Sequence, residues 1–241
     1  MVVIHRIFRR ESGLLARLVR AVSPGDTARA ELLAENIEEY LTGLHHHHSL
    51  EEELIWPLLS ERASGHQEVV ELMKNQHQAI DITLAAISTT LPFWRERAHK
   101  DAGELLAGAL DEHREILLVH LDHEEKLVLP LIEDHLTVAE WDRVGKHGLE
   151  TVPKDKLMLA LGAILEEANP QERAYFLARV PAVGRLALRL VGRRQYARRR
   201  RLVRDDLYTV QAGTRTVFAD APSLQVGAGV APFRAYGSPH S

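Results

Sequence analysis

The sequence predicts an all-α protein: an up-down-up-down four-helix bundle followed by a C-terminal helical extension. Three observations support this prediction. Apolar residues recur at helical spacing, and no stretch alternates with the period of two that is typical of a strand. Hydrophobic residues make up 45% of the chain and aromatic residues only 5%, and the apolar residues are mainly the helix-compatible Leu, Ala and Val. Short connections separate four long periodic segments, which favours antiparallel neighbours.

Turn and capping residues delimit the first two helices. Residues 2–21 carry apolar side chains at helical spacing and are followed by the turn sequence Ser-Pro-Gly-Asp. Asp26 or Thr27 is a suitable N-cap for a second helix, which continues to about Arg62, where a Ser-Gly pair follows. The two helices are therefore predicted to be joined by a short turn.

The third and fourth helices are predicted in the same way. The third covers about residues 66–91 and is expected to break at Pro92, because proline cannot donate the helical hydrogen bond. The fourth covers about residues 100–135. Residues 1–136 thus form one predicted bundle domain.

Two segments follow the bundle. Residues 137–204 are predicted to form a helical extension, in which Thr137 caps a short helix and two more helices cover residues 155–167 and 170–180. Residues 205–241 are rich in Gly, Ala, Pro and Ser and lack sustained periodicity. We expect them to be a disordered tail.

Composition excludes several classes of protein. The chain has no cysteine, which excludes disulfides, zinc–thiolate sites, iron–sulfur clusters and thiol catalysis, so any metal must be bound by nitrogen and oxygen. No uninterrupted apolar run approaches the length of a membrane span, and charges interrupt any signal-peptide region near the start. We therefore expect a cytoplasmic protein that is not transmembrane.

An internal repeat indicates a metal site. The second helix contains HHSLEEELIWP from His47, and the fourth contains HLDHEEKLVLP from His120. Both read H-x-x-x-E-E-x-L followed by two hydrophobic residues and proline. Each proline must kink or end its helix at the same distance from the histidine. The repeat therefore specifies a geometry as well as a composition.

The spacing within the repeat brings an imidazole and a carboxylate together. Residues four apart lie on one face of a helix, which pairs His47 with Glu51 and His120 with Glu124. Buried groups of this kind are costly unless they are paired or coordinate a metal. Two such faces turned inward would converge on one metal centre.

The repeat also selects a register. His48 with Glu52 is an equally good pair four residues apart, but alignment on the two prolines selects the neighbouring pair. His48 is then expected to face solvent or to lie behind the ligands. His113 lies about 10 Å along the helix axis from the fourth-helix pair, too far for the same centre. We expect His113 to support the ligands or to line a channel.

The other two helices each offer a histidine. His5 shares a face with apolar residues of the first helix, and His77 on the third helix is followed one turn later by Asp81, a possible seventh ligand. Four histidines and two carboxylates suit two metal ions bridged by the carboxylates, and the donors alone accommodate Fe, Mn or Zn. The candidate metal ligands are His5, His47, Glu51, His77, His120 and Glu124.

These motifs resemble the hemerythrin family, in particular bacterial proteins of the actinobacterial type with a hemerythrin HHE cation-binding domain. The resemblance covers about residues 1–136. It implies an up-down-up-down bundle with a non-haem di-iron centre, so it favours two Fe ions where Mn or Zn would otherwise stay open. The oxygen carriers of the family use five histidines and two bridging carboxylates.

The chain departs from these oxygen carriers in its third helix. The carriers place two histidines one turn apart there, whereas here Asp81 follows His77 and Met73 precedes it. One metal is then expected to be bound more weakly, by Asp81 or by solvent, which leaves an open position. The carriers also space the fourth-helix pair five apart, which would select Glu125 in place of Glu124.

A competing di-iron plan is disfavoured. Ferritin-like bundles use Glu-x-x-His twice, and here that spacing occurs only from Glu96 to His99, in a predicted loop.

Two functions stay open for a hemerythrin-like centre. The first is the binding or sensing of a small diatomic ligand, O2 or NO, without catalysis. The alternative is an oxidoreductase that acts on peroxide or nitric oxide at the open position.

A basic segment follows the predicted bundle. Nine arginines and no acidic residue occur between Arg185 and Arg204. The segment Arg193–Arg204 is expected to lie on an acidic surface of its own bundle, to contact a protein partner, or to bind an anionic surface such as a membrane or nucleic acid. Tyr196 is the only aromatic residue among the arginines, so sequence-specific nucleic-acid recognition is not expected.

Overall fold

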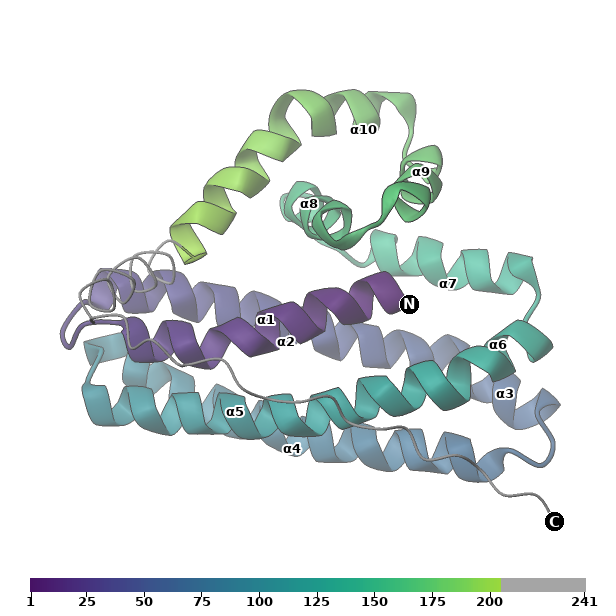
Figure 1. Ribbon diagram of the computed structural model, residues 1–241, viewed down its shortest axis with the longest axis horizontal. Helices are drawn as coiled ribbons and strands as arrows, with labels where there is room; N and C mark the ends of the chain where they lie inside the picture. Colours follow the sequence, from purple (N-terminus) through teal and green to yellow (C-terminus); the bar gives the residue numbers. More distant parts are fainter. Residues whose placement is uncertain (205–241) are drawn as a thin grey trace, which may run out of the picture. The chain divides into compact units, whose positions relative to one another are not determined.

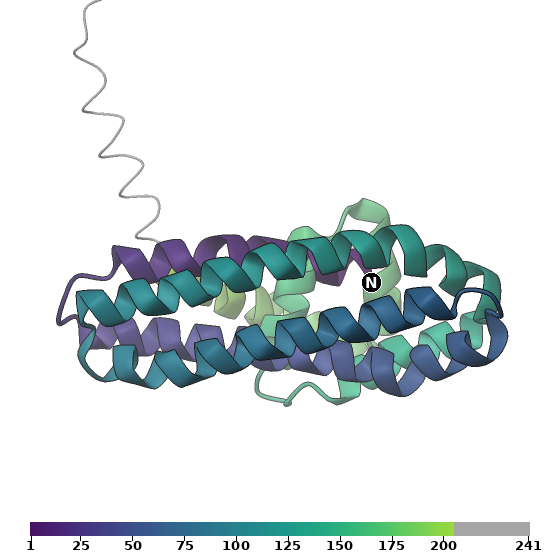
Figure 2. The ribbon, with the colours of Figure 1, turned by 90° about the horizontal axis from the view of Figure 1, so that it is seen from below.

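The computed structural model describes residues 1–204, and every regular element in this range is a helix. This confirms the all-α prediction. Figures 1 and 2 show the long helices side by side, each running opposite to the one before it. These helices are α1 (Val2–Ala21), α2 (Thr27–Leu54), α4 (Gln67–Arg97) and α5 (Lys100–His123). The tail predicted over residues 205–241 lies outside the described residues.

Both prolines of the internal repeat interrupt a long helix, as predicted. After α2 the chain turns at Ile55 and continues as α3 (Trp56–Arg62), with Pro57 in the first turn. After α5 it forms the π-helix η1 (Glu124–Val128) and then α6 (Leu129–His135), with Pro130 in the first turn. Proline is tolerated at these positions because the first N–H groups of a helix have no helical acceptor.

The connections follow the local signals in the sequence. The Asp26 side chain accepts a hydrogen bond of 3.0 Å from the backbone N–H of Arg29 and so caps α2. Gly25 and Gly65 adopt positive φ angles of 85° and 101° in the turns before α2 and after α3. These turns reverse the chain within a few residues and place consecutive long helices next to each other.

The predicted break at Pro92 is wrong. Helix α4 continues through Pro92 to Arg97 and ends where Ala98 adopts a φ of 49°. Leu91 and Trp94 are both buried in the bundle core. Their packing on both sides of Pro92 outweighs the cost of one lost helical hydrogen bond.

Two apolar clusters fill the bundle, with a polar layer between them. Leu44 of α2 belongs to the larger cluster, and Ile55, directly after α2, belongs to the smaller one. On α4, Ile80 belongs to the larger cluster and Met73 to the smaller one. The histidines and glutamates of the internal repeat fall between these apolar positions along the chain. Other members of the larger cluster are Leu15, Leu33, Ile37, Ile87, Leu106, Leu110 and Leu117.

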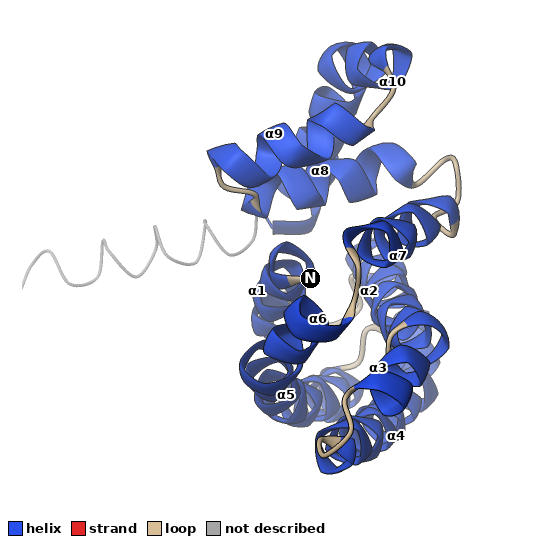
Figure 3. Ribbon diagram, turned by 90° about the vertical axis from the view of Figure 1, so that its right-hand side faces the viewer, coloured by secondary structure: helices blue, strands red, loops and turns tan. Residues whose placement is uncertain are grey.

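The extension is helical as predicted and packs on the bundle (Figure 3). Thr137 caps its first helix with a full capping box. Ile164 and Ala168 pack against Val3 of α1. The bundle and the extension belong to one compact unit. The predicted domain boundary at residue 136 therefore stays a prediction. Its elements are α7 (Val138–Glu150), α8 (Leu157–Glu167), α9 (Pro170–Arg179), α10 (Ala182–Ala187) and the π-helix η2 (Leu188–Gly192), followed by helix over residues 193–204.

Gly162 of α8 allows this last helix to approach closely. A Cβ atom at Gly162 would lie 2.5 Å from Cγ of Tyr196, so Gly162→Ala forces the tyrosine ring out of its position. We expect a loss of about 1–3 kcal/mol in the free energy of unfolding, measured by urea denaturation. Gly108→Ala in α5 is the matched control, because nothing lies within 4 Å of its added Cβ. An unchanged midpoint for Gly162→Ala would contradict this packing.

Candidate metal centre

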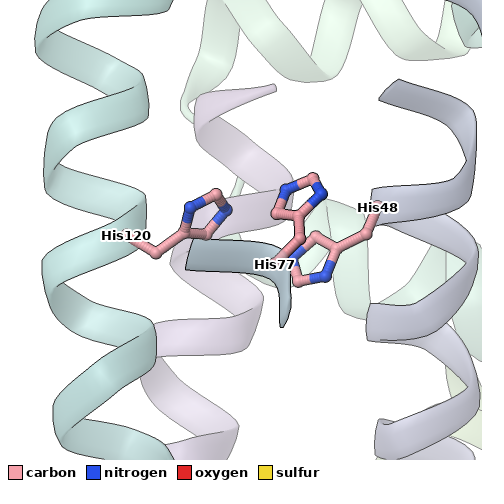
Figure 4. Close-up of side chains that lie close together, drawn as sticks. All are labelled: His48, His77 and His120. Atoms are coloured by element: carbon pink, nitrogen blue, oxygen red, sulfur yellow. The ribbon is translucent and has the colours of Figure 1, made fainter. Parts of the chain in front are cut away.

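Seven histidine and glutamate side chains from the long helices converge in the polar layer. They form two groups, and within each group one ligand atom per residue lies within 4.8 Å of the others. The first group joins α2, α4 and α5 through His48, His77 and His120 (Figure 4). The second group consists of His5, His47, Glu51 and Glu124.

Glu51 lies between the two groups. Its Oε1 atom is 3.0 Å from Nε2 of His47, and its Oε2 atom is 3.4 Å from Nε2 of His77. One carboxylate therefore directs its two oxygens at different groups. This is the arrangement that a bridging carboxylate needs.

Glu124 also contacts both groups. Its Oε2 atom is 3.2 Å from Nε2 of His5 and 3.6 Å from Nε2 of His120. Glu124 is the first residue of the π-helix η1, and π-helical turns often occur at functional sites. The two internally repeated glutamates thus occupy equivalent positions in the centre.

Most polar atoms that face the centre lack hydrogen-bond partners among the described residues, although Nε2 of His5 and Nε2 of His47 lie 3.3 Å apart and contact each other. This holds for both oxygens of Glu51 and Glu124, for Nε2 of His77 and His120, and for both ring nitrogens of His48. Six of the seven side chains are at most 3% exposed. An unpaired buried polar group costs about 1–3 kcal/mol, and a charged one more. Metal ions bound by these atoms would offset that cost, so the residues fit a metal centre.

Burial keeps the imidazoles of His48 and His120 in the neutral form, which can bind metal. It lowers the pKa of His48 well below its usual range and that of His120 to about 3, so both rings are neutral at pH 7. Burial, and next the nearby Glu124 carboxylate, raise the pKa of Glu51 well above its usual range. In the metal-free protein, a proton on Glu51 relieves the repulsion between the carboxyl groups of Glu51 and Glu124. A bound cation would displace this proton.

Three of the histidines can donate their Nδ1–H group to an oxygen outside the centre. This fixes the ring orientation and leaves the lone pair of Nε2 directed at the centre. The pairs are His5 with Glu125 at 2.9 Å, His77 with Glu52 at 3.1 Å and His120 with Gln76 at 3.3 Å.

These contacts separate the two glutamates that the sequence left as alternatives. Glu124 belongs to the second group, whereas Glu125 lies behind His5 and also accepts a hydrogen bond of 3.1 Å from Arg9. In this arrangement Glu125 orients a histidine and Glu124 faces the centre.

The prediction that His48 faces solvent or lies behind the ligands is wrong. Its ring is 3% exposed and stacks on His77, with 4.1 Å between ring centroids. Asp81 is exposed and lies outside both groups, so the structure does not bring this possible seventh ligand to the centre. One feature of the sequence points to a ligand role for His48. The third helix lacks the second histidine of the oxygen carriers, and His48 on α2 can take its place.

His113 belongs to a separate buried network. The Thr83 hydroxyl donates to the Ile80 carbonyl at 2.7 Å, so its oxygen accepts the Nδ1–H of His113 at 2.8 Å. The remaining lone pair on Nε2 accepts the Tyr40 hydroxyl at 2.7 Å. No hydrogen bond or ring contact joins His113 to either metal-site group among the described residues. Its expected role, support of the ligands or lining of a channel, stays a prediction.

The comparisons with known proteins agree with this geometry. The family model of the hemerythrin HHE cation binding domain matches residues 1–137. This range contains α1 to α6 and every member of the two groups. No curated protein and no solved structure matches the chain.

Substitution of His48 distinguishes this centre from the one that the repeat alone predicts. His48→Ala removes one of the three nitrogen donors of the first group, and we expect metal affinity to fall by at least about tenfold. His45→Ala is the matched control, because His45 is an exposed histidine of the same four-histidine run. Metal content after equilibrium dialysis measures both variants. Equal metal content in the two variants would contradict a ligand role for His48.

Proposed function

Because the chain belongs to the family of hemerythrin HHE cation-binding domains, we propose that its bundle holds two iron ions and binds a small diatomic ligand, O2 or NO. The family supports the binding of a cation, and the donors support more than one. Nitrogen and oxygen donors also suit Mn and Zn, so the preference for iron rests on the family.

One observation carries the proposal of a two-metal centre. Each buried carboxylate contacts a histidine of both groups, at 3.0 and 3.4 Å for Glu51 and at 3.2 and 3.6 Å for Glu124. With His48 included, the centre offers five histidines and two carboxylates, the same number that the resemblance to the oxygen carriers implies. The centre would therefore have a full set of ligands. Its fifth histidine comes from α2, whereas the carriers take it from the third helix.

The surroundings restrict the ligand to a small molecule. Two histidines belong to the second group and three to the first, so the second group leaves more room for an external ligand. Phe8 is 6% exposed and its ring lies 5.3 Å from that of His47, so an apolar ring borders the second group. When bound, iron supplies redox chemistry and a coordination position for the ligand.

A second candidate, an oxidoreductase acting on peroxide or nitric oxide, is favoured by one contact. His77 donates its Nδ1–H to Glu52, which is 55% exposed and lines a surface pocket of about 380 Å³ together with Trp56 and His77. Reduction of peroxide consumes protons, and Glu52 connects the His77 ring with solvent. This contact could supply them.

Iron analysis with ligand binding tests the proposed function. We expect about two iron ions per chain, a stable O2 or NO adduct seen by absorption spectroscopy, and no sustained peroxide consumption. His47→Ala and Glu124→Ala should both lower the iron content. Fewer than about one iron per chain, unchanged in these variants, would overturn the two-metal centre.

The same preparation distinguishes the two candidates. If the iron-loaded protein consumes peroxide over many turnovers, and Glu52→Gln slows this without changing the iron content, the oxidoreductase is supported. A stable adduct that Glu52→Gln leaves unchanged, with no turnover, supports the binding protein. Glu53→Gln is the matched control, because Glu53 is an exposed neighbour outside both groups.

A further inference from the structure

The chain forms one continuous helical run from Ala182 to Arg204, through α10, η2 and the helix that follows. Its inward side is firmly packed. Leu188 is buried with Leu161 and Leu165 of α8, and the Tyr196 hydroxyl donates to Glu166 at 2.5 Å. This run therefore cannot turn its outward side toward the bundle without loss of these contacts.

Part of the arginine segment lies on acidic residues of its own chain, as one of the sequence interpretations predicts. These arginines face the bundle and α8, and their charges are neutralised there. The pairs are Arg199 with Glu35 and Glu39, Arg200 with Glu166, and Arg204 with Glu11 and Glu166.

The outward side of the same run is apolar at its start. Val183, Leu186 and Leu190 are spaced three and four residues apart, which places them on one face. Buried Leu188 lies about 200° around the axis from Leu186 and Leu190. Val183 is 81% exposed and Leu190 is 59% exposed. Figures 1 and 3 show α10 at the edge of the extension farthest from the long helices.

The outward side is basic in its second half. Five exposed arginines have no ion pair among residues 1–204, and no acidic residue occurs between Glu172 and Asp205 to neutralise them. Exposed apolar side chains and then exposed cationic side chains therefore follow one another along this helical run. The exposed arginines are Arg189, Arg193, Arg194, Arg198 and Arg201.

We propose that this outward side, from Val183 to Arg201, binds the surface of an anionic phospholipid bilayer. The leucine and valine side chains would enter the boundary between headgroups and acyl chains, and the arginines would bind lipid phosphates. No described helix is long and apolar enough to cross a membrane, so the contact is peripheral. The helix lies in the plane of the membrane, with the metal-binding bundle on its aqueous side.

The apolar residues select lipid over other anionic partners. A nucleic-acid backbone would neutralise the arginines but offers nothing to bury Val183, Leu186 and Leu190. Aromatic residues that stack on bases are missing from the outward side between residues 182 and 204, where Tyr196 is packed inward. A bilayer supplies both a phosphate layer and an apolar layer at the distances that one amphipathic helix spans.

Vesicle flotation of the full chain tests this inference. We expect binding to vesicles of phosphatidylcholine with phosphatidylglycerol, weaker binding at high salt, and none to phosphatidylcholine alone. One arginine near an anionic surface contributes a factor of about five. Arg193→Gln with Arg194→Gln should therefore weaken binding at least about tenfold, and Leu186→Ser with Leu190→Ser should weaken it as well. Iron content should not change in either variant.

Matched controls carry the same chemical change elsewhere. Arg143→Gln with Lys146→Gln removes two exposed cations from α7, and Ile82→Ser with Leu105→Ser removes two exposed apolar side chains from α4 and α5. Both should bind vesicles as the unsubstituted chain does. Equal binding in all variants, or no binding to anionic vesicles, would overturn the inference. Two other results would also overturn it, if vesicle binding is absent. One is binding to DNA, and the other is a dimer that dissociates when Leu186→Ser and Leu190→Ser are introduced.

Discussion

Two carboxylates, Glu51 and Glu124, are buried among five histidines, and the packing of the bundle has to accommodate them. Both side chains are at most 1% exposed, and none of their oxygens has a hydrogen-bond partner among the described residues. Such an arrangement is unfavourable by itself, because two carboxylates repel each other and lose hydration. Cations held between the two histidine groups would turn this cost into binding energy, and apolar packing on both sides keeps the layer closed.

The local structure of the bundle serves this layer. Each glutamate is followed six residues later by a proline that starts a new short helix, and Glu124 itself opens a π-helical turn. These irregularities lie at the boundary between the polar layer and the smaller apolar cluster, where Trp56 and Val128 close the bundle. Carboxylate and amide oxygens outside the layer, such as that of Glu125 behind His5, orient the histidine rings without entering the layer.

Much of this was predictable from the sequence, for a physical reason. The repeat of histidine, glutamate and proline at fixed offsets specified which residues share a helix face and where two helices are interrupted. The position of His48 could not be predicted in this way. The repeat selects one histidine on each helix face, whereas α2 directs two adjacent histidines, His47 and His48, toward the centre. Pro92 misled the prediction because its cost is local, whereas the packing of Trp94 that outweighs it depends on the fold.

Anomalous diffraction from crystals of the iron-loaded protein shows whether the two groups form one centre that shares its carboxylates. We expect two iron peaks about 3.5–4 Å apart, one beside His48, His77 and His120 and the other beside His5 and His47. Glu51 and Glu124 should lie in contact with both peaks. A single peak, or a second peak away from these two carboxylates, would contradict a shared centre.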